Sequence, residues 1–255
     1  MISENIQNDV IELAKLAGHR IMEIYEKDFS VFEKEDLSPL TEADLISHQT
    51  IINKLAEITS DIPVLSEESA SEELQNRMSW DRYWLIDPLD GTKEFIKKNG
   101  EFTVNIALIE SHTPSFGVVY APALDNIYYG GREIGSFKGV GEEVPVQIQT
   151  KKNASGKMKI VGSRSHQSEE FKKFIENYPN ADIIYMGSSL KICLVAEGEA
   201  DLYPRLGPTS EWDTAAAQAV LEGAGGQLED YNTVEILGYN QKEDSLLNPH
   251  FLARS

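Results

Sequence analysis

Near the start of the chain, apolar positions recur every three or four residues, which is the spacing of an amphipathic helix. Residues 3–27 show this pattern first, and Ser3 is suited to cap the helix. After a turn at Pro39, Thr41 is expected to cap a second helix that runs to about Thr59. We expect both helices to pack one apolar face against a core.

The pattern then changes to short apolar runs bounded by turn residues, which is typical of strands. In the first half we predict strands at 61–66, 83–86, 102–109, 115–120, 126–129 and 144–149, with a glycine-rich hairpin at 130–141. Asp87 is expected to end the strand at 83–86, and Thr92 to open a short helix. The short spacing between the later strands favours antiparallel pairing.

In the second half, predicted strands alternate with predicted helices, which favours a layer of mixed α and β structure. Strands are predicted at 158–162, 182–185 and 200–205, and helices at 168–177, at 188–197 and from the cap Ser210 to 223–226. The small and polar residues 150–157 mark a boundary. We therefore expect an N-terminal α+β half at 1–150 and a C-terminal α/β half at 151–255.

Composition narrows the class of protein. Hydrophobic residues make up 41% of the 255 residues and charged residues 25%, as in ordinary globular proteins. The formal net charge of −19 argues against a nucleic-acid polymer as partner, but a small phosphorylated substrate is compatible with it where cations reverse the local field. We find neither a bilayer-spanning apolar run nor a signal peptide. The single Cys193 is expected to be a buried thiol in a reducing compartment.

The stretch 84–95 carries the strongest chemical signal. Two carboxylates, Asp87 and Asp90, follow a predicted buried strand, and a helix is then expected to begin at Gly91 and Thr92. Carboxylates bind hard cations such as Mg²⁺, and a helix N-terminus binds phosphate oxygens. Metal beside phosphate is the chemistry of phosphoryl transfer. An ordinary turn after a strand would explain the same residues.

Three further carboxylates, Asp44, Glu67 and Asp213, come from separate segments. Asp44 and Asp213 each follow a cap residue by three positions, so both also fit a capping box. Glu67 follows an apolar strand but also begins an acidic stretch that is typical of a solvated loop. If all five met at one point they would repel one another, and the cluster would need cations.

The motifs together resemble the inositol monophosphatase superfamily. They are the segments 38–44, 65–68, 84–95 and 212–216. A narrower resemblance, to bacterial 3′(2′),5′-bisphosphate nucleotidases, is carried by 93–96, 99–108, 118–122 and 187–198. It implies an α+β fold built as a layered αβαβα sandwich and a lithium-sensitive, Mg²⁺-dependent phosphatase. The half at 1–150 would carry most metal ligands, and the half at 151–255 would complete the metal and nucleotide site.

The resemblance also implies roles by matched position. Glu67, Asp87 and the Leu89 carbonyl would hold one Mg²⁺, and Asp87, Asp90 and Asp213 a second. Asp44 and Thr92 would orient the attacking water, near a third and weaker ion, with Glu67 counted among the catalytic residues. Substrate contacts would come from Glu67, Leu89, Asp90, Gly91, Thr92, Ser188, Lys191, Arg205 and Asp213. His166 could lie near the nucleoside, although a surface histidine is the preferred interpretation.

The implied reaction is hydrolysis of the 3′-phosphate of adenosine 3′,5′-bisphosphate to AMP and phosphate, linked to sulfate assimilation. The resemblance also allows 3′-phosphoadenylyl sulfate, a sulfated relative of this nucleotide, as a second substrate. An inositol or sugar phosphate phosphatase is the alternative within the class, disfavoured by residues 93–95, and a non-catalytic metal or nucleotide sensor is the alternative outside it. A cytoplasmic protein is expected; peripheral association with the inner membrane and the oligomeric state stay open.

Overall fold

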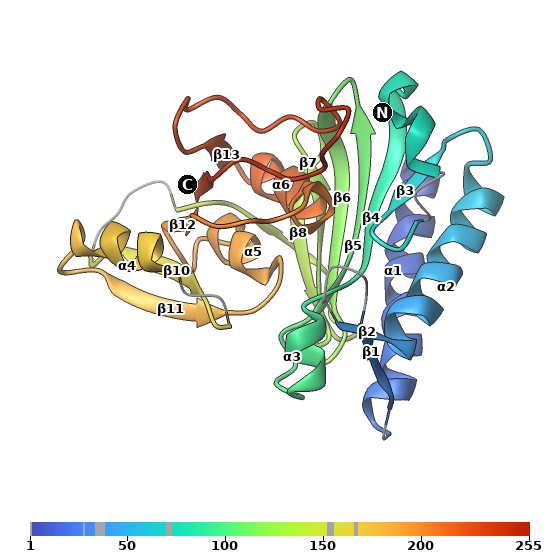
Figure 1. Cartoon of the computed structure of the whole chain (residues 1–255), viewed down its shortest axis with the longest axis horizontal. Helices are drawn as coiled ribbons and strands as arrows, with labels where there is room; N and C mark the ends of the chain where they lie inside the picture. Colours follow the sequence, from blue (N-terminus) through green and yellow to red (C-terminus); the bar gives the residue numbers. More distant parts are fainter. Residues whose placement is uncertain (1, 28, 34–38, 70–72, 152–155, 166–167) are drawn as a thin grey trace.

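The computed structural model describes residues 2–27, 29–33, 39–69, 73–151, 156–165 and 168–255. Its first layer consists of two long helices, α1 (Glu4–Tyr25) and α2 (Glu42–Ile58), which pack against each other and against one face of a large sheet (Figure 1). Ser3 and Thr41 are the N-caps of these helices, as the sequence predicts, because each side-chain oxygen accepts a backbone N–H of the first turn.

The large sheet forms the second layer. Its strands are β3 (Val64–Ser66), β4 (Arg82–Asp90), β5 (Thr103–Glu110), β6 (Thr113–Ala121), β7 (Asn126–Gly131), β8 (Gly135–Val140) and β9 (Val146–Ile148), and they neighbour one another in that order. Only the first pair, β3 and β4, is parallel; the other pairs are antiparallel, as their short connections predict.

The third layer consists of α5 (Leu190–Ala196) and α6 (Ala215–Gly223), which lie between the two sheets (Figure 1). The fourth is a smaller sheet with the order β11-β10-β12-β14-β13, whose strands are β10 (Lys159–Ser163), β11 (Asp182–Met186), β12 (Leu202–Arg205), β13 (Gln227–Asp230) and β14 (Phe251–Arg254). The helix α4 (Glu169–Glu176) covers its outer face. The arrangement is the αβαβα sandwich, so the predicted fold class is confirmed.

Hydrophobic cores fill the spaces between these layers. Along β5, Val104, Ile106 and Leu108 face α1 and α2, whereas Ala107 and Ile109 face α5 and α6. This alternation follows from the two-residue repeat of a strand. On β6, Gly117 lets α6 approach closely, since a Cβ there would lie 2.2 Å from the carbonyl oxygen of Ala216.

Several short elements were not predicted. The strands β1 (Val31–Glu33) and β2 (Pro39–Thr41) pair with each other, and η1 (Glu73–Ser79) is a 3₁₀ helix. The strands β13 and β14 were also not predicted. Their pairs with neighbouring strands are antiparallel, so the smaller sheet contains both parallel and antiparallel pairs. Each of these two strands has only four residues, and β14 pairs with β12 from the far end of the chain. Such long-range pairing leaves no local periodic signal.

Three predicted boundaries were wrong. β4 does not end at Asp87 but continues to Asp90 with a register shift. The helix expected from Ser188 begins at Leu190, because Ser188 has a left-handed φ of 49°. The helix expected from Ser210 is split into a 3₁₀ turn, η2 (Glu211–Asp213), and α6. The division into halves at residues 150 and 151 stays a prediction.

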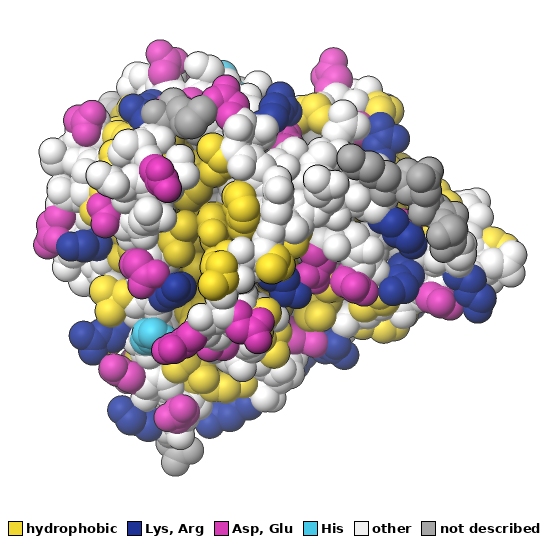
Figure 2. Space-filling model, turned by 180° about the vertical axis from the view of Figure 1, so that it is seen from behind, with side chains coloured by type: hydrophobic (Ala, Val, Ile, Leu, Met, Phe, Trp, Pro, Cys, Tyr) yellow, Lys and Arg dark blue, Asp and Glu magenta, His cyan; other side chains and the backbone are white. Residues whose placement is uncertain are grey.

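The outer surface is mixed in character. On the face seen in Figure 2, Lys and Arg side chains are scattered among Asp and Glu, and a hydrophobic band runs down the middle. Among the helices of the described residues, none has both the length and the apolar character needed to cross a bilayer.

Candidate active site

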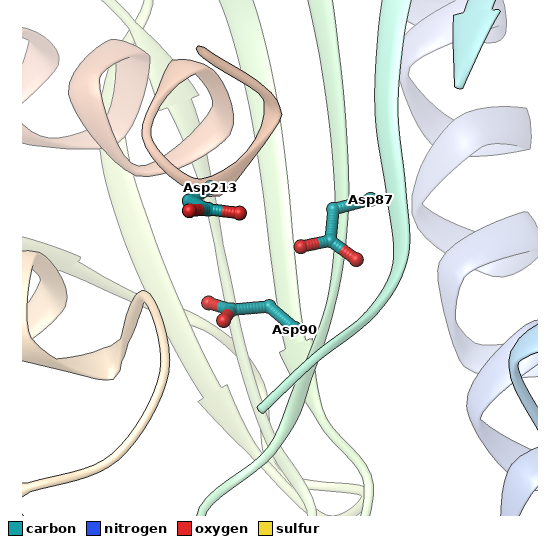
Figure 3. Close-up of side chains that lie close together, drawn as sticks. All are labelled: Asp87, Asp90 and Asp213. Carbon is teal, nitrogen blue, oxygen red and sulfur yellow. The ribbon is translucent and has the colours of Figure 1, made fainter. Parts of the chain in front are cut away.

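An irregularity in β4 brings the two carboxylates of the central motif to the same side of the sheet. Asp87 pairs with Asn105 and Asp90 with Thr103, so two residues of β4 lie opposite one residue of β5. This is a β-bulge. In a regular strand, residues three positions apart point to opposite faces. The extra residue removes this opposition, and both side chains point into the space beneath α6 (Figure 3).

Asp213 completes a cluster with these two side chains. One oxygen from each of Asp87, Asp90 and Asp213 lies within 4.8 Å of the others, and the three side chains point toward one another (Figure 3). Asp213 is held by the turn before α6, where its Oδ2 accepts a 2.9 Å hydrogen bond from the Ser210 N–H. The capping role predicted for Asp213 is therefore confirmed, and the same side chain also joins the cluster.

Burial and mutual repulsion raise the pKa of each carboxyl in this cluster. Burial is the largest cause for Asp87, whose pKa lies well above its ordinary value, and the charges of Glu67, Asp90 and Asp213 add to it. For Asp213, burial followed by the charges of Asp90 and Glu67 raises the pKa to about 8. The four predicted metal-binding carboxylates therefore interact electrostatically, and each proton or cation that enters the cluster relieves this repulsion.

Asp44 joins the site through the start of α2. Its Oδ2 accepts hydrogen bonds from the backbone N–H of Thr41 (2.7 Å) and from its hydroxyl (2.6 Å), which confirms the predicted capping box. Its Oδ1 accepts a 3.3 Å hydrogen bond from the hydroxyl of Thr92. Because one oxygen caps the helix and the other reaches Thr92, the capping and active-site interpretations of this residue are compatible.

The turn after β4 presents backbone groups beside the cluster. Gly91 has a left-handed φ of 94° and precedes α3 (Thr92–Ile96). A Cβ at this position would lie 3.2 Å from the carbonyl oxygen of Glu101, so glycine suits both the conformation and the space. Gly91 and Thr92 line the same pocket as Glu67, Asp90 and Asp213. N–H groups at the start of a helix are suited to phosphate oxygens.

Cationic side chains line the same pocket from the second half of the chain. Lys191 is 8% exposed, and burial lowers its pKa to about 8 although the charge of Asp90 opposes the shift. Its ammonium donates to the Ser188 carbonyl oxygen and lies 5.6 Å from the centre of the Tyr203 ring. The Arg205 guanidinium donates to Thr209 Oγ1 and to the Pro208 carbonyl oxygen, both at 2.6 Å. These contacts hold both cations in the pocket.

The helix α2 supports the site from the other side of the sheet. Besides Asp44, it carries Ser47, whose hydroxyl donates a 2.7 Å hydrogen bond to the carbonyl oxygen of Pro88 in the bulge. His48 Nδ1 lies 2.9 Å from the hydroxyl of Ser66, the residue before Glu67. Residues at positions i, i+3 and i+4 share one face of a helix. One helix face therefore contacts both segments of the first half that carry predicted metal ligands, 65–68 and 84–95.

The structure brings most of the predicted residues to one place. Glu67, Asp90, Gly91, Thr92, Ser188, Lys191, Arg205 and Asp213 line one pocket. The Leu89 side chain is buried in the core between the large sheet and the helices α1 and α2, and its N–H donates to Asp87 Oδ1 at 3.0 Å. His166 lies outside the described residues. The roles of all these residues as ligands or catalysts stay predictions.

Three residues that contact the site were not singled out in the sequence: Ser47, Glu94 and Ser189. Glu94 and Ser189 both line the pocket. The backbone N–H of Ser189 donates to Asp90 Oδ2 at 2.5 Å. Both residues fall inside motifs of the family resemblance, which is the one local signal that points to them. Ser47 contacts the site through the backbone carbonyl of Pro88, and a sequence motif of side chains does not predict such a contact.

The donor set of the cluster fits a hard divalent cation. Within the described residues, it consists of carboxylates alone, without histidine or cysteine. All-oxygen sites prefer Mg²⁺, Ca²⁺ or Mn²⁺ over softer metals. The raised pKa values of Asp87, Asp90 and Asp213 show that uncompensated negative charge is unfavourable there.

Comparisons with known proteins point the same way. Residues 3–250 match the model of the inositol monophosphatase family. The chain is 47% identical over 244 residues to the 3′(2′),5′-bisphosphate nucleotidase CysQ of Salmonella typhimurium, covering 95% of this chain and 96% of the relative. The CysQ of Escherichia coli K12 is also 47% identical, over 96% of this chain and 97% of its own.

Solved structures agree with this fold. The crystal structure of CysQ from Bacteroides thetaiotaomicron superposes with a TM-score of 0.86 at 42% identity, covering 98% of this chain and 96% of that one. An inositol monophosphatase from Thermotoga maritima superposes with a TM-score of 0.78 at 26% identity, covering 96% of this chain and 90% of that one.

Proposed function

This chain belongs to the inositol monophosphatase family, and we propose that it hydrolyses the 3′-phosphate of adenosine 3′,5′-bisphosphate to give AMP and phosphate. One observation carries the choice of chemistry: three carboxylates from β4 and η2 converge beside the turn at Gly91 and Thr92. The choice of substrate is supported by the 47% identity to nucleotidases. It is also supported by the side chains of Lys191 and Arg205, which line another part of the same pocket.

Asp87, Asp90 and Asp213 would hold divalent cations, with Glu67 and the Leu89 carbonyl completing the ligands. We expect two Mg²⁺ ions in this set and a third, weaker one near Asp44. Bound ions of this kind shield phosphate charge and lower the pKa of water. The raised pKa values of the cluster support the assignment, because a cation replaces protons that these carboxyls would otherwise keep.

The remaining residues orient the reactants. Thr92 donates to Asp44 Oδ1, so its hydroxyl oxygen keeps its lone pairs for a hydrogen bond from the attacking water. This pair would fix the line of attack on a phosphate that is held by the N–H groups of Gly91 and Thr92. At the other phosphate, Lys191 and Arg205 supply positive charge, with Ser188 beside them. The nucleotide would therefore bind at both phosphates.

A substrate panel tests this proposal. Purified protein with Mg²⁺ is given adenosine 3′,5′-bisphosphate, 3′-phosphoadenylyl sulfate, inositol 1-phosphate and a sugar phosphate, and released phosphate is measured. We expect the two nucleotides to give the highest kcat/KM. A preference for inositol 1-phosphate would replace the proposal with an inositol phosphatase, and binding without turnover would replace it with a sensor.

The chemistry assigned here is linked to sulfate assimilation, in which 3′-phosphoadenylyl sulfate leaves adenosine 3′,5′-bisphosphate as a by-product. We place the protein in the cytoplasm, which is compatible with a single buried cysteine, Cys193, and hence with a fold that has no internal disulfide.

A further inference from the structure

The side chain of Glu94 is largely buried, and its carboxylate faces the active-site pocket. The residue is 4% exposed and lines the pocket. In the part of the chain that the structure describes, its carboxylate makes neither a hydrogen bond nor an ion pair. Its charge acts on Lys191 and Arg164 without a hydrogen bond to either, so its oxygens are available to a donor on a bound ligand.

Other buried glutamates of this protein differ from Glu94 in this respect. Glu211 accepts a 2.8 Å hydrogen bond from the backbone N–H of Asn240, and Glu222 accepts one of 3.1 Å from Gln218. Glu229 accepts a 2.6 Å hydrogen bond from Arg254. All three are less than a tenth exposed. Each of these three glutamates therefore has a hydrogen-bond partner, whereas the Glu94 carboxylate, in the described part of the chain, has none.

Glu94 lies between the two places where phosphates are proposed to bind. It follows Thr92 by two residues in α3, next to the turn that would hold the phosphate to be cleaved. Burial is the main cause of the shifted pKa values of Asp90 and Lys191, and the charge of Glu94 acts on both groups. On the other side, its Cγ would be 2.8 Å from a Cβ at Gly187, which precedes Ser188.

A nucleoside 3′,5′-bisphosphate that spanned these two places would have its ribose next to Glu94. The 3′ and 5′ oxygens of that ribose are phosphate esters, so the 2′-hydroxyl is its one remaining O–H donor. We propose that Glu94 accepts a hydrogen bond from this 2′-hydroxyl and thereby selects ribonucleotides over deoxyribonucleotides. This inference rests on the proposed function.

Two substrates that differ in one oxygen test the inference. kcat/KM is measured with Mg²⁺ for adenosine 3′,5′-bisphosphate and for its 2′-deoxy analogue. Because a hydrogen bond to a charged group is strong, we expect the native protein to prefer the ribonucleotide by about tenfold or more. In Glu94→Ala the preference should fall to about twofold or less, and Glu94→Gln, which keeps a neutral acceptor, should lie between.

Two controls separate this role from a general effect on the fold. Glu222→Gln changes another buried glutamate, outside the active-site pocket, and should leave the preference unchanged. Thermal unfolding of Glu94→Ala should show a midpoint close to that of the native protein, because no hydrogen bond or ion pair to a described residue is broken.

The outcomes distinguish this inference from the function on which it rests. If the native protein cleaves the ribonucleotide but Glu94→Ala keeps the same preference, or if both substrates lose activity by the same factor, only the role of Glu94 is overturned. If Glu94→Ala lost its discrimination against inosine 3′,5′-bisphosphate but kept its preference for the ribonucleotide, Glu94 would contact the base. That result would overturn the ribose contact. Absence of turnover with either nucleotide would overturn the proposed function as well.

Discussion

The backbone N–H of Ser189 donates a 2.5 Å hydrogen bond to Asp90 Oδ2, although the two residues are 99 positions apart. The Ser189 hydroxyl also donates to Asn105 Oδ1 and lies 2.8 Å from Thr103 Oγ1, both on β5. Asn105 and Thr103 are the residues that flank the bulge in the pairing with β4. Ser189 therefore joins the segment before α5 to the bulge itself, which sets the position of Lys191 relative to the carboxylate cluster.

Replacing Asp90 with asparagine should abolish activity and leave the fold intact. The amide oxygen can still accept the Ser189 N–H, but the charge that attracts a divalent cation is lost. We expect kcat to fall by at least about 100-fold, as when a charge-stabilising group is removed from an active site. Phosphate release measures the loss, and circular dichroism checks the fold. Activity near the native level would mean that Asp90 is not a ligand.

Replacing Thr92 with alanine removes the hydroxyl that donates to Asp44 Oδ1. If the pair orients water in the transition state, kcat should fall by about 100-fold while KM changes little. Thr92→Ser keeps the hydroxyl and should retain most of the activity. Steady-state kinetics on both variants test this, and a raised KM with an unaltered kcat would contradict the water-orienting role.

The metal-free protein should lose stability as the pH rises from about 4 to about 8. Burial raises the pKa of Asp90 to about 6 and of Asp213 to about 8 from an ordinary 3.8, so the folded state holds protons that the unfolded chain releases. Stability from these groups is fully present below their unfolded pKa and is lost as the pH passes the folded values. Lys191 has the opposite sign, because its lowered pKa of about 8 adds stability only at higher pH.

Thermal unfolding after chelation, measured from pH 5 to pH 8, checks this prediction. The midpoint should fall with rising pH, and saturating Mg²⁺ should remove most of the fall because it binds the ionised cluster of the folded state. Asp213→Asn should reduce the slope without Mg²⁺. A flat profile in the absence of metal would contradict the repulsion inferred for the cluster.

Replacing Ser47 with alanine should weaken metal activation although Ser47 does not line the pocket. The change leaves the Pro88 carbonyl in the bulge without its 2.7 Å hydrogen bond, and losing such a buried partner costs about 1–3 kcal/mol. We expect a higher Mg²⁺ concentration for half-maximal activity, with Ser47→Thr restoring it. Gln49→Ala, on the exposed side of α2, is the control. An unchanged Mg²⁺ requirement would limit Ser47 to a structural role.

Much of the site could be expected from local sequence because caps and strand ends have local signatures. The Thr41–Asp44 and Ser210–Asp213 capping boxes were predicted from three-residue spacing and are present. The choice between capping and active-site roles could not be made locally. That choice depends on whether an oxygen of Asp44 accepts a hydrogen bond from Thr92, and these two residues are 48 positions apart.

The sequence by itself determined the alternation of elements and the acidic residues available for a site, because these follow from hydrophobic period and residue type. It indicated the layered fold class through the motifs that resemble the inositol monophosphatase superfamily. The tertiary structure alone decided that Asp87 and Asp90 point the same way, since the strand period would separate them and only pairing with β5 creates the bulge. It also decided that the Glu94 side chain is buried at the pocket, because burial depends on segments distant in the chain that pack around it.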